Sequence, residues 1–340
     1  MTRSFYLAAL TLMLCAASTW AQTKVETLVE GLNNPCGVAV QPETGDVFVA
    51  DSGAHRIVRV TDGKAEEVIV GFPNDVYGKG PMYDIGPLGL AFLGKDTLVV
   101  GGGGKPDGEE MLRVYEVPAA GSEPIKADKM VASFTLPGKD VGTDKEIKGE
   151  GNFYALVVIG DAIYVSSNGD DTKGWVNKAT IKDGKVVSYE RSVATKEATG
   201  VDAPVGVTSQ PRSGALVVGQ MGEITVPNDA LVTFYNPKNG KMRMNLETGL
   251  FDITGLAYSP KGRLYATDFA WMDTAEGGLF RLIPQRDGDK QGITTEKVTS
   301  LDKPTALTFG PDGALYITVI GTASEENANA GKLLKIAPGL

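Results

Sequence analysis

The sequence predicts an all-β chain made of six four-stranded units closed into a ring. Three observations lead to this expectation: a short aliphatic motif returns six times, a turn and a second strand follow each copy, and the chain begins with a strand that has no local partner. The 340 residues include 43 glycines and 18 prolines, which suits many short strands joined by tight turns. Four strands per repeat of about 50 residues is the pattern of a β-propeller blade, so we predict a six-bladed β-propeller.

The repeated motif places a small residue among aliphatic ones, as an inner strand packed on both faces requires. Its six copies centre on Gly37, Gly89, Ala155, Gly206, Gly255 and Ala306. Successive centres are 52, 66, 51, 49 and 51 residues apart. The regular spacing predicts one inner strand per blade.

The outer strands of each blade follow in order. In the first unit, strands at 38–40, 47–50 and 56–60 are separated by turns that contain Pro42, Gly45 and Gly53. Third strands are expected at 111–117, 279–283 and 332–336, and more polar fourth strands at 66–70, 130–136 and 295–301.

The two ends of the chain predict how the ring closes. The last unit stops after its third strand, while residues 25–29 form a strand without a partner in the first unit. If this first strand completes the last blade, neither end leaves an exposed sheet edge. We therefore expect the N-terminal strand to close the propeller.

The first 21 residues predict a secretory signal peptide. Arg3 precedes an apolar stretch at 7–17, and cleavage is expected after Ala21. An uncleaved anchor is less consistent with so short an apolar run, and Leu14 before Cys15 argues against a lipid anchor. We expect a single domain at 22–340, secreted or periplasmic, with no membrane span after cleavage.

Charge and residue counts exclude several function classes. The formal charge of −9 disfavours binding to nucleic acid. His55 is the only histidine, so a zinc site with three histidines is impossible and a Ser-His-Asp triad is not expected. Cys36, alone after signal cleavage, is expected to be a buried thiol. After these exclusions we expect a monomer whose partner is a protein, a glycan or a small molecule.

One stretch of the first unit resembles a known family. Asp51-Ser52-Gly53-Ala54-His55-Arg56-Ile57 is similar to the strand-turn-strand signature of NHL repeats, and 262–268 is a weaker version of it. NHL-like propellers of six blades are similar in layout to the regucalcin/gluconolactonase and strictosidine-synthase-like groups. The resemblance implies a fold and leaves the activity open.

Acidic and amide residues recur where the blades reach one face of the ring. In the loops before the inner strands they are Asn33, Asp84, Glu150, Asp202, Asp252 and Asp302. In the loops between second and third strands they are Asp51, Asn168, Asp170, Asp171, Glu223, Asp268, Asp273 and Glu276. Such residues commonly lock turns through their own backbone hydrogen bonds. Gathered around a channel, they would also suit a hard cation such as Ca²⁺.

The segment 149–152, Gly-Glu-Gly-Asn, resembles the Gly-Glu-Gly that supplies a metal-binding Glu in regucalcin-like lactonases. That resemblance implies Glu150 as a metal ligand, with Asn168 and Asp202 or Asp252 as partners and Ca²⁺ as the ion. The match is short and falls in a different blade from the one that family uses.

Aromatic and further polar residues on the same loops are candidate ligand-binding groups. Trp175 and Trp271 are predicted either as platforms for a flat ligand or as plugs of their own blades. The other candidates are Asp84, Asn152 and Asp268. The four glycines at 101–104 lack the helix and the Lys-Ser/Thr ending of a phosphate loop, so we expect a flexible loop there.

Two functions are consistent with these patterns. The first is a non-enzymatic binding or scaffold module that uses the acidic, loop-rich face, and the lack of catalytic histidines favours it. The alternative is a Ca²⁺-dependent hydrolase of the lactonase or esterase type, in which the metal activates water.

Overall fold

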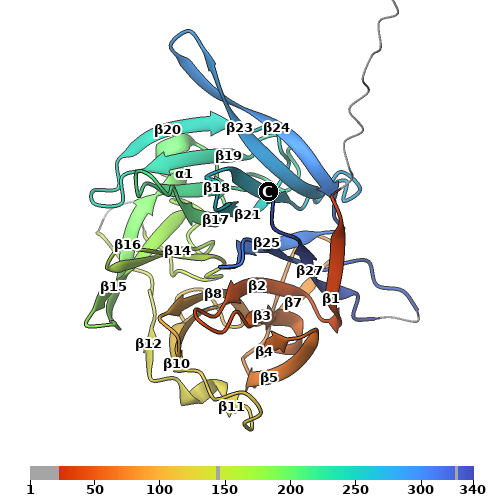
Figure 1. The fold of residues 1–340 in the computed structure, drawn as a ribbon. Helices are drawn as coiled ribbons and strands as arrows, with labels where there is room; N and C mark the ends of the chain where they lie inside the picture. Colours follow the sequence, from red (N-terminus) through yellow and green to blue (C-terminus); the bar gives the residue numbers. More distant parts are fainter. Residues whose placement is uncertain (1–22, 143–145, 326–327) are drawn as a thin grey trace, which may run out of the picture.

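The computed structural model describes residues 23–142, 146–325 and 328–340. The predicted signal peptide at 1–21 lies outside these residues. Six sheets of antiparallel blade strands surround a central axis (Figure 1). In each sheet the strand that begins the repeat lies nearest the axis. The predicted six-bladed β-propeller is confirmed.

The strands fall into blades as the repeats predict. Blade 1 contains β2 (Pro35–Val40), β3 (Val47–Asp51), β4 (Arg56–Thr61) and β5 (Lys64–Val70). Blade 2 contains β8 (Pro87–Leu93), β9 (Thr97–Gly102), β10 (Leu112–Glu116) and β12 (Ala132–Phe134). Blade 3 contains β13 (Leu156–Ile159), β14 (Ala162–Ser166), β15 (Trp175–Lys182) and β16 (Lys185–Ala194). Blade 4 contains β17 (Pro204–Ser209), β18 (Leu216–Gln220), β19 (Leu231–Tyr235) and β20 (Met242–Glu247). Blade 5 contains β21 (Ile253–Tyr258), β22 (Leu264–Asp268), β23 (Gly278–Asp287) and β24 (Lys290–Ser300). Blade 6 contains β25 (Pro304–Phe309), β26 (Leu315–Val319), β27 (Gly331–Ile336) and β1 (Val25–Leu32).

The ring closes in blade 6. β1 pairs antiparallel with β27, from Val25 opposite Ile336 to Leu32 opposite Gly331. The first strand of the described chain is therefore the outermost strand of the last blade, as predicted, and it covers the edge that β27 would otherwise expose.

A few elements lie outside the blades. β6 (Asp75–Tyr77) and β7 (Tyr83–Ile85) form a short hairpin between blades 1 and 2, and β11 (Ile125–Lys126) adds to the outer edge of β5. The helical turns are η1 (Ser52–Ala54), η2 (Ala127–Lys129) and α1 (Thr195–Thr199). Within the described ranges, no helix has the length and apolar character needed to cross a bilayer.

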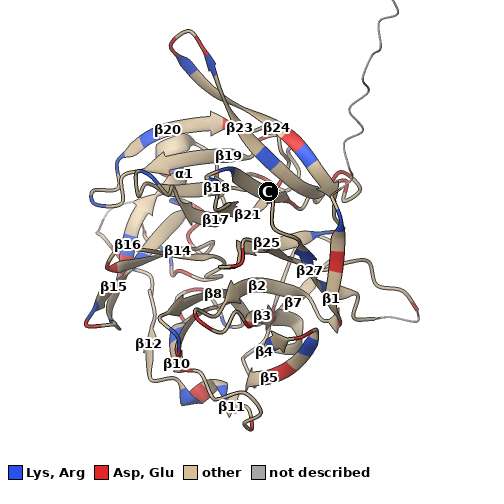
Figure 2. Cartoon of the chain, viewed as in Figure 1, with Lys and Arg blue, Asp and Glu red and all other residues tan. Residues whose placement is uncertain are grey.

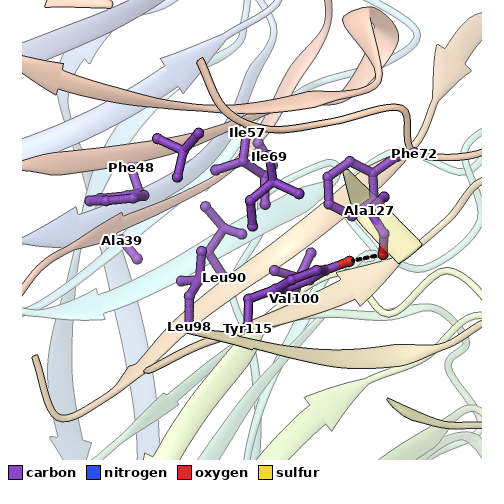
Figure 3. Packing of buried hydrophobic residues seen from close by; sticks show 12 residues of the cluster. Ala39, Phe48, Ile57, Ile69, Phe72, Leu90, Leu98, Val100, Tyr115 and Ala127 are labelled. Carbon is purple, nitrogen blue, oxygen red and sulfur yellow. Dashed lines mark hydrogen bonds between the residues drawn. The ribbon is translucent and has the colours of Figure 1, made fainter. Parts of the chain in front are cut away.

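The hydrophobic core lies between neighbouring blades. Between blades 1 and 2, the Phe48 and Phe92 rings meet edge to face with centroids 5.0 Å apart. The buried Tyr115 hydroxyl donates a hydrogen bond of 2.7 Å to the Ala127 carbonyl, which fastens the segment after β11 over this cluster (Figure 3). Burying one such aromatic side chain contributes roughly 1.5–3 kcal/mol.

The glycines at 101–104 are buried, so the prediction of a flexible loop was wrong. Gly101 and Gly102 belong to β9. A Cβ on Gly101 would lie 2.0 Å from the Phe153 carbonyl oxygen, and one on Gly104 would lie 2.0 Å from that of Pro73. Backbone atoms therefore approach Gly101 and Gly104 too closely for a side chain, and the side chains of Glu110 and Leu88 do the same at Gly102 and Gly103.

Candidate functional site

A pocket of about 70 Å³ lies on the axis of the ring. Every blade contributes a residue at or just before its inner strand: Cys36, Leu88, Tyr154, Val205, Thr254 and Thr305. Because the six inner strands converge only at the axis, a cavity lined by all of them sits in the central channel.

Tyr154 crosses the channel from blade 3. Its hydroxyl donates a hydrogen bond of 3.1 Å to the Thr305 carbonyl in blade 6. Hydroxyls also join neighbouring blades: Thr305 Oγ1 donates to the Pro35 carbonyl at 2.6 Å, and Thr254 Oγ1 to the Pro304 carbonyl at 2.7 Å. These bonds fix the inner strands around the pocket, so its wall is preorganised.

The β6–β7 hairpin closes the pocket with aromatic side chains. The rings of Tyr77 and Tyr83 lie edge to face against Trp271, with centroids 6.3 and 5.7 Å away. Phe269 stacks on Trp271 at 4.8 Å. The Asn34 amide donates to the Asp84 carbonyl at 2.7 Å and ties the hairpin to blade 1. The hairpin thus reaches from blade 1 to the aromatic loop of blade 5.

The polar groups in the pocket are uncharged. Asn34, Asn152 and Asn168 line it, and the Asn168 amide donates to the Tyr77 hydroxyl at 3.2 Å. None of the lining residues is Asp, Glu, Lys or Arg. Burial raises the pKa of the Cys36 thiol to about 12, so this thiol stays protonated at neutral pH.

Acidic side chains lie outside the pocket. Asp75, Asp107 and Asp171 are exposed, and the pKa of Asp107 is raised by its partial burial and then by the charges of Asp171 and Asp75. Burial is the larger cause, and the two neighbouring carboxylates add to it. The charges of Asp171, Asp202 and Asp252 also raise the pKa of the pocket residue Tyr77, after the larger effect of its burial, so these carboxylates place negative charge near the pocket.

The structure places Glu150, the first predicted metal ligand, in a buried ion pair. Its Oε1 accepts a hydrogen bond from Arg191 Nε at 3.0 Å, and its Oε2 accepts one from the Ser167 hydroxyl at 2.5 Å. Burial raises the pKa of Glu150 to about 7, against the lowering effect of these two bonds. Both carboxylate oxygens are therefore already engaged.

The other two carboxylates of the predicted set are engaged as well. Asp202 pairs with Lys196 at 2.5 Å, and its second oxygen accepts the Ala203 N–H at 2.7 Å. Asp252 Oδ2 accepts the Trp271 N–H at 2.5 Å. Burial, with a smaller effect of the Asp268 charge, raises the pKa of Asp252 to about 7.

This arrangement does not fit a Ca²⁺ site as it stands. Ca²⁺ takes six to eight oxygen ligands, yet the described part of the chain has no group of three or more His, Cys, Asp or Glu side chains placed to share a metal ion. The metal set stays a prediction, and it would require Glu150 to exchange Arg191 for the ion.

The predicted ligand-binding residues separate into two groups. Asn152 and Trp271 line the pocket, together with Asn168. Asp84 is exposed on β7, and Trp175 lies outside the lining, where its Nε1 donates to Asp170 at 3.2 Å. Asp268 is buried as a turn lock, because its Oδ1 accepts the Asp252 N–H at 2.7 Å and its Oδ2 the Phe251 N–H at 3.0 Å.

Sequence reasoning missed the hairpin that carries Tyr77 and Tyr83. A signal was present, since residues 75–85 place two short alternating segments around a Gly-Lys-Gly-Pro turn. The hairpin lies outside the six repeats, and the repeat pattern therefore did not mark it.

Comparison with known proteins supports the fold. No family model matches the chain, and no curated protein matches it. A Thermus thermophilus structure described as an oxidoreductase (glucose dehydrogenase) is similar over 92% of this chain and 99% of its own, with a TM-score of 0.63 and 18% identity.

Two further solved structures show the same likeness. PQQ-bound aldose sugar dehydrogenase from Streptomyces coelicolor covers 93% of this chain and 98% of its own, with a TM-score of 0.59 and 16% identity. A gluconolactonase from Xanthomonas campestris covers 93% and 90%, with a TM-score of 0.57 and 14% identity. The chain thus has the propeller layout of the gluconolactonase-like proteins that its sequence resembles.

PQQ, a flat tricarboxylate, does not fit the axial pocket as the structure has it. The lining offers no Lys or Arg to neutralise carboxylates. The negative charges of Asp171, Asp202 and Asp252, which act on the pocket residue Tyr77, would further repel such an anion.

Proposed function

We propose that this propeller takes a small, neutral carbohydrate-class ligand, a sugar or a sugar lactone, into the axial pocket. The observation that carries the proposal is the composition of the lining, which is predominantly apolar and aromatic through Tyr77, Tyr83 and Trp271, includes the amides of Asn152 and Asn168, and contains no charge. A partly open pocket on the axis of the ring, lined by aromatic rings and amides, favours the enzyme-type alternative over a scaffold that acts through its acidic surface.

The two kinds of lining group match the two kinds of surface on a sugar. Aromatic rings bury the apolar C–H face of a sugar ring, while amides donate and accept hydrogen bonds with its hydroxyls. The acidic surroundings select against anionic ligands such as a sugar acid. The names of the structural neighbours, sugar dehydrogenases and a gluconolactonase, support the same ligand class.

The size of the pocket requires the β6–β7 hairpin to move on binding. A cavity of about 70 Å³ holds roughly five to seven waters when one water occupies about 10–15 Å³ on this measure, which is too little space for a sugar ring with its hydroxyls. The tip of the hairpin is held by Lys79 and Glu223, whose charged atoms are 3.9 Å apart and exposed. Such surface pairs contribute about 0–1 kcal/mol. Opening the pocket also separates Tyr77 and Tyr83 from Trp271, so contacts with the ligand have to replace these ring contacts.

Calorimetric titration with glucose, glucono-1,5-lactone and gluconate tests this proposal. We expect binding of a neutral ligand, weaker or absent binding of gluconate, and at least a tenfold loss of affinity in Trp271→Ala. Trp175→Ala is the matched control, because Trp175 lies outside the lining. Equal losses in the two variants, or no binding of any neutral sugar or lactone, would contradict the proposal.

Lactone hydrolysis is a second candidate, favoured by Asp252. This carboxylate is 2% exposed, has a pKa raised to about 7 by burial, and accepts the backbone N–H of the pocket residue Trp271. Asp252 does not line the pocket, so it would act as a general base only on a water that reaches it beside Trp271, and a pKa near neutrality suits that role. Gluconolactone hydrolysis should then rise with pH through about 7 and be lost in Asp252→Asn. Inhibition by EDTA would indicate the Ca²⁺-dependent form instead.

A further inference from the structure

A second concave site lies between blades 4 and 5, on the outer side of the ring. This groove has a volume of about 450 Å³. Its floor is the apolar core between the two blades, where Phe234, Leu246 and Leu282 are buried and Met244 and Ile293 are partly exposed. The core is therefore open to solvent at this place.

One wall of the groove is a two-stranded ribbon. The last pair between β22 and β23 is Leu264 with Leu282, whereas β23 and β24 continue pairing as far as Asp287 and Lys290. The ribbon projects beyond the body of blade 5 (Figure 1). Two strands without a further neighbour are marginally stable in water, so a partner on this ribbon would stabilise it.

Cations surround the groove although the chain is acidic overall. Arg263, Arg281 and Arg286 line it, and Arg212 and Lys261 line the adjoining depression. Figure 2 shows further basic positions on β20 and on the ribbon, with acidic positions at the ribbon tip. Lys238 and Arg243 belong to the other side of blade 4, because they line a depression together with Tyr164 of blade 3. Arg281 and Arg286 each lie 3.9 Å from one carboxylate, that of Glu296 and that of Asp289, in exposed pairs that another carboxylate can replace at small cost. The groove therefore combines an apolar floor with a rim that carries more cations than anions.

Another pair of blades in this protein already has an extra segment bound at its outer edge. Between blades 1 and 2, the chain's own β11 pairs in parallel with the outer edge of β5, with Ile125 opposite Ile69. The residues that follow β11 pack on the core between those blades. In blade 4 the corresponding outer strand is β20, which is the last strand of its sheet.

We propose that the groove between β20 and the β23–β24 ribbon binds an extended, acidic segment of another protein, in which acidic and apolar residues alternate. The apolar side chains would lie on Met244 and Ile293, and the carboxylates would meet the arginines. Adding a strand at a free sheet edge is a common mode of peptide recognition. This site is independent of the axial pocket and goes beyond the proposed sugar binding.

Three other occupants, the N-terminal residues, a second copy of the chain and a lipid bilayer, match the charge or shape of the groove less well. Residues 1–22 contain no Asp or Glu and cannot supply the acidic segment. A second copy whose acidic face entered this groove would make a head-to-tail contact, which leads to an open chain of molecules unless the rotation closes. A flat bilayer cannot reach the floor of a concave site.

Fluorescence anisotropy with a labelled peptide of about ten alternating Glu and Val residues tests the inference. We expect saturable binding and about a tenfold or larger loss in Arg281→Glu/Arg286→Glu, because reversed charges repel the peptide. Lys182→Glu/Lys185→Glu, which reverses two exposed cations on blade 3, is the control and should leave binding unchanged. Ile293→Ser keeps every charge and should still weaken binding several-fold.

Three results would overturn the inference. The first is an alternating Lys and Val peptide that binds as well as the acidic one. The second is an acidic peptide whose affinity is the same in the arginine variant and the control. The third is arginine-dependent self-association in sedimentation, or arginine-dependent flotation with phosphatidylglycerol vesicles, either of which would assign the groove to another occupant.

Discussion

Blades 1 and 5 carry an aspartate at the same place, at the end of the second strand. Asp51 in β3 and Asp268 in β22 are both buried. Each accepts backbone N–H groups of the segment that leads into its inner strand, Asp51 from Asn33 at 2.6 Å and Asp268 from Asp252 at 2.7 Å. The repeated aspartate is therefore a lock between two turns of one blade.

The two blades differ in what surrounds this lock. Asp51 Oδ2 pairs with Arg56 Nε at 2.8 Å, which closes a short loop. In blade 5 a longer loop follows Asp268 and carries Trp271 to the axial pocket, and the second carboxylate beside the lock is Asp252. The comparison teaches that a repeat can keep its structural residue while the loop after it gains a side chain that lines the axial pocket.

The largest effect is expected for Asp268→Ala. This carboxylate accepts three backbone N–H groups, from Phe251, Asp252 and Ala270, and each buried donor left unpaired costs about 1–3 kcal/mol. We expect the free energy of unfolding to fall by about 3–5 kcal/mol in urea titrations. Asp273→Ala, in the exposed part of the same loop, is the control. A change of less than about 1 kcal/mol would show that Asp268 is not a lock.

Asp51→Ala should have a smaller effect, about 2–3 kcal/mol. The substitution leaves the Asn33 N–H without its acceptor, and it removes one of the two carboxylates that pair with Arg56. Arg56 keeps its second partner, because its Nη1 also pairs with Glu67 at 2.8 Å. The same urea titration compares the two blades, and a larger loss for Asp51 than for Asp268 would reverse the comparison.

Asp252 should make stability depend on pH. Its pKa in the folded protein is raised from the ordinary 3.8 to about 7. Between these values the folded state holds more protons than the unfolded one, so the contribution of Asp252 to stability falls as pH rises. Asp252→Asn removes this slope, and its stability relative to the wild type should rise by about 1–2 kcal/mol from pH 5 to pH 8.

Urea unfolding at several pH values measures this difference, and Asp289→Asn on the exposed ribbon tip is the control. A variant with the same pH dependence as the wild type would contradict the assignment of a raised pKa to Asp252.

The smallest effect is expected for His55→Asn. His55 has φ 55° and caps η1 through its backbone, a left-handed conformation that Asn tolerates well. We expect a change within about 0.5 kcal/mol, since the ring's contact with Asn74 is exposed. His55→Val should destabilise more, because a β-branched residue is strained at positive φ. Equal effects of the two variants in thermal melts would argue against a backbone role.

The regular repeat of the sequence made the fold predictable. It also limited the prediction of the site, because only residues within the repeats could be placed. The repeated inner strands and the unpaired first strand were enough to predict six blades and their closure. Trp271, Asn152 and Asn168 were predicted because they lie on loops that belong to the repeats. Tyr77 and Tyr83 were missed because their hairpin has no counterpart in the other blades.

Long-range partners account for the remaining differences. Glu150 looked like a metal ligand in its local Gly-Glu-Gly context, but its partner Arg191 lies on β16, in the outermost strand of blade 3. Gly101 and Gly104 looked flexible by composition, yet their neighbours are backbone atoms of Phe153 and Pro73. Neither relation is present in a short stretch of sequence.

The pairing of β1 with β27 also constrains how the chain folds during its synthesis. A ribosome makes β1 before the other strands of the six blades and β27 after them, so β1 stays unpaired until blade 6 has been synthesised. Such distant pairing slows folding. A nascent chain that stops before blade 6 therefore cannot close the propeller. A factor that binds its unpaired first strand would raise the yield of folded protein.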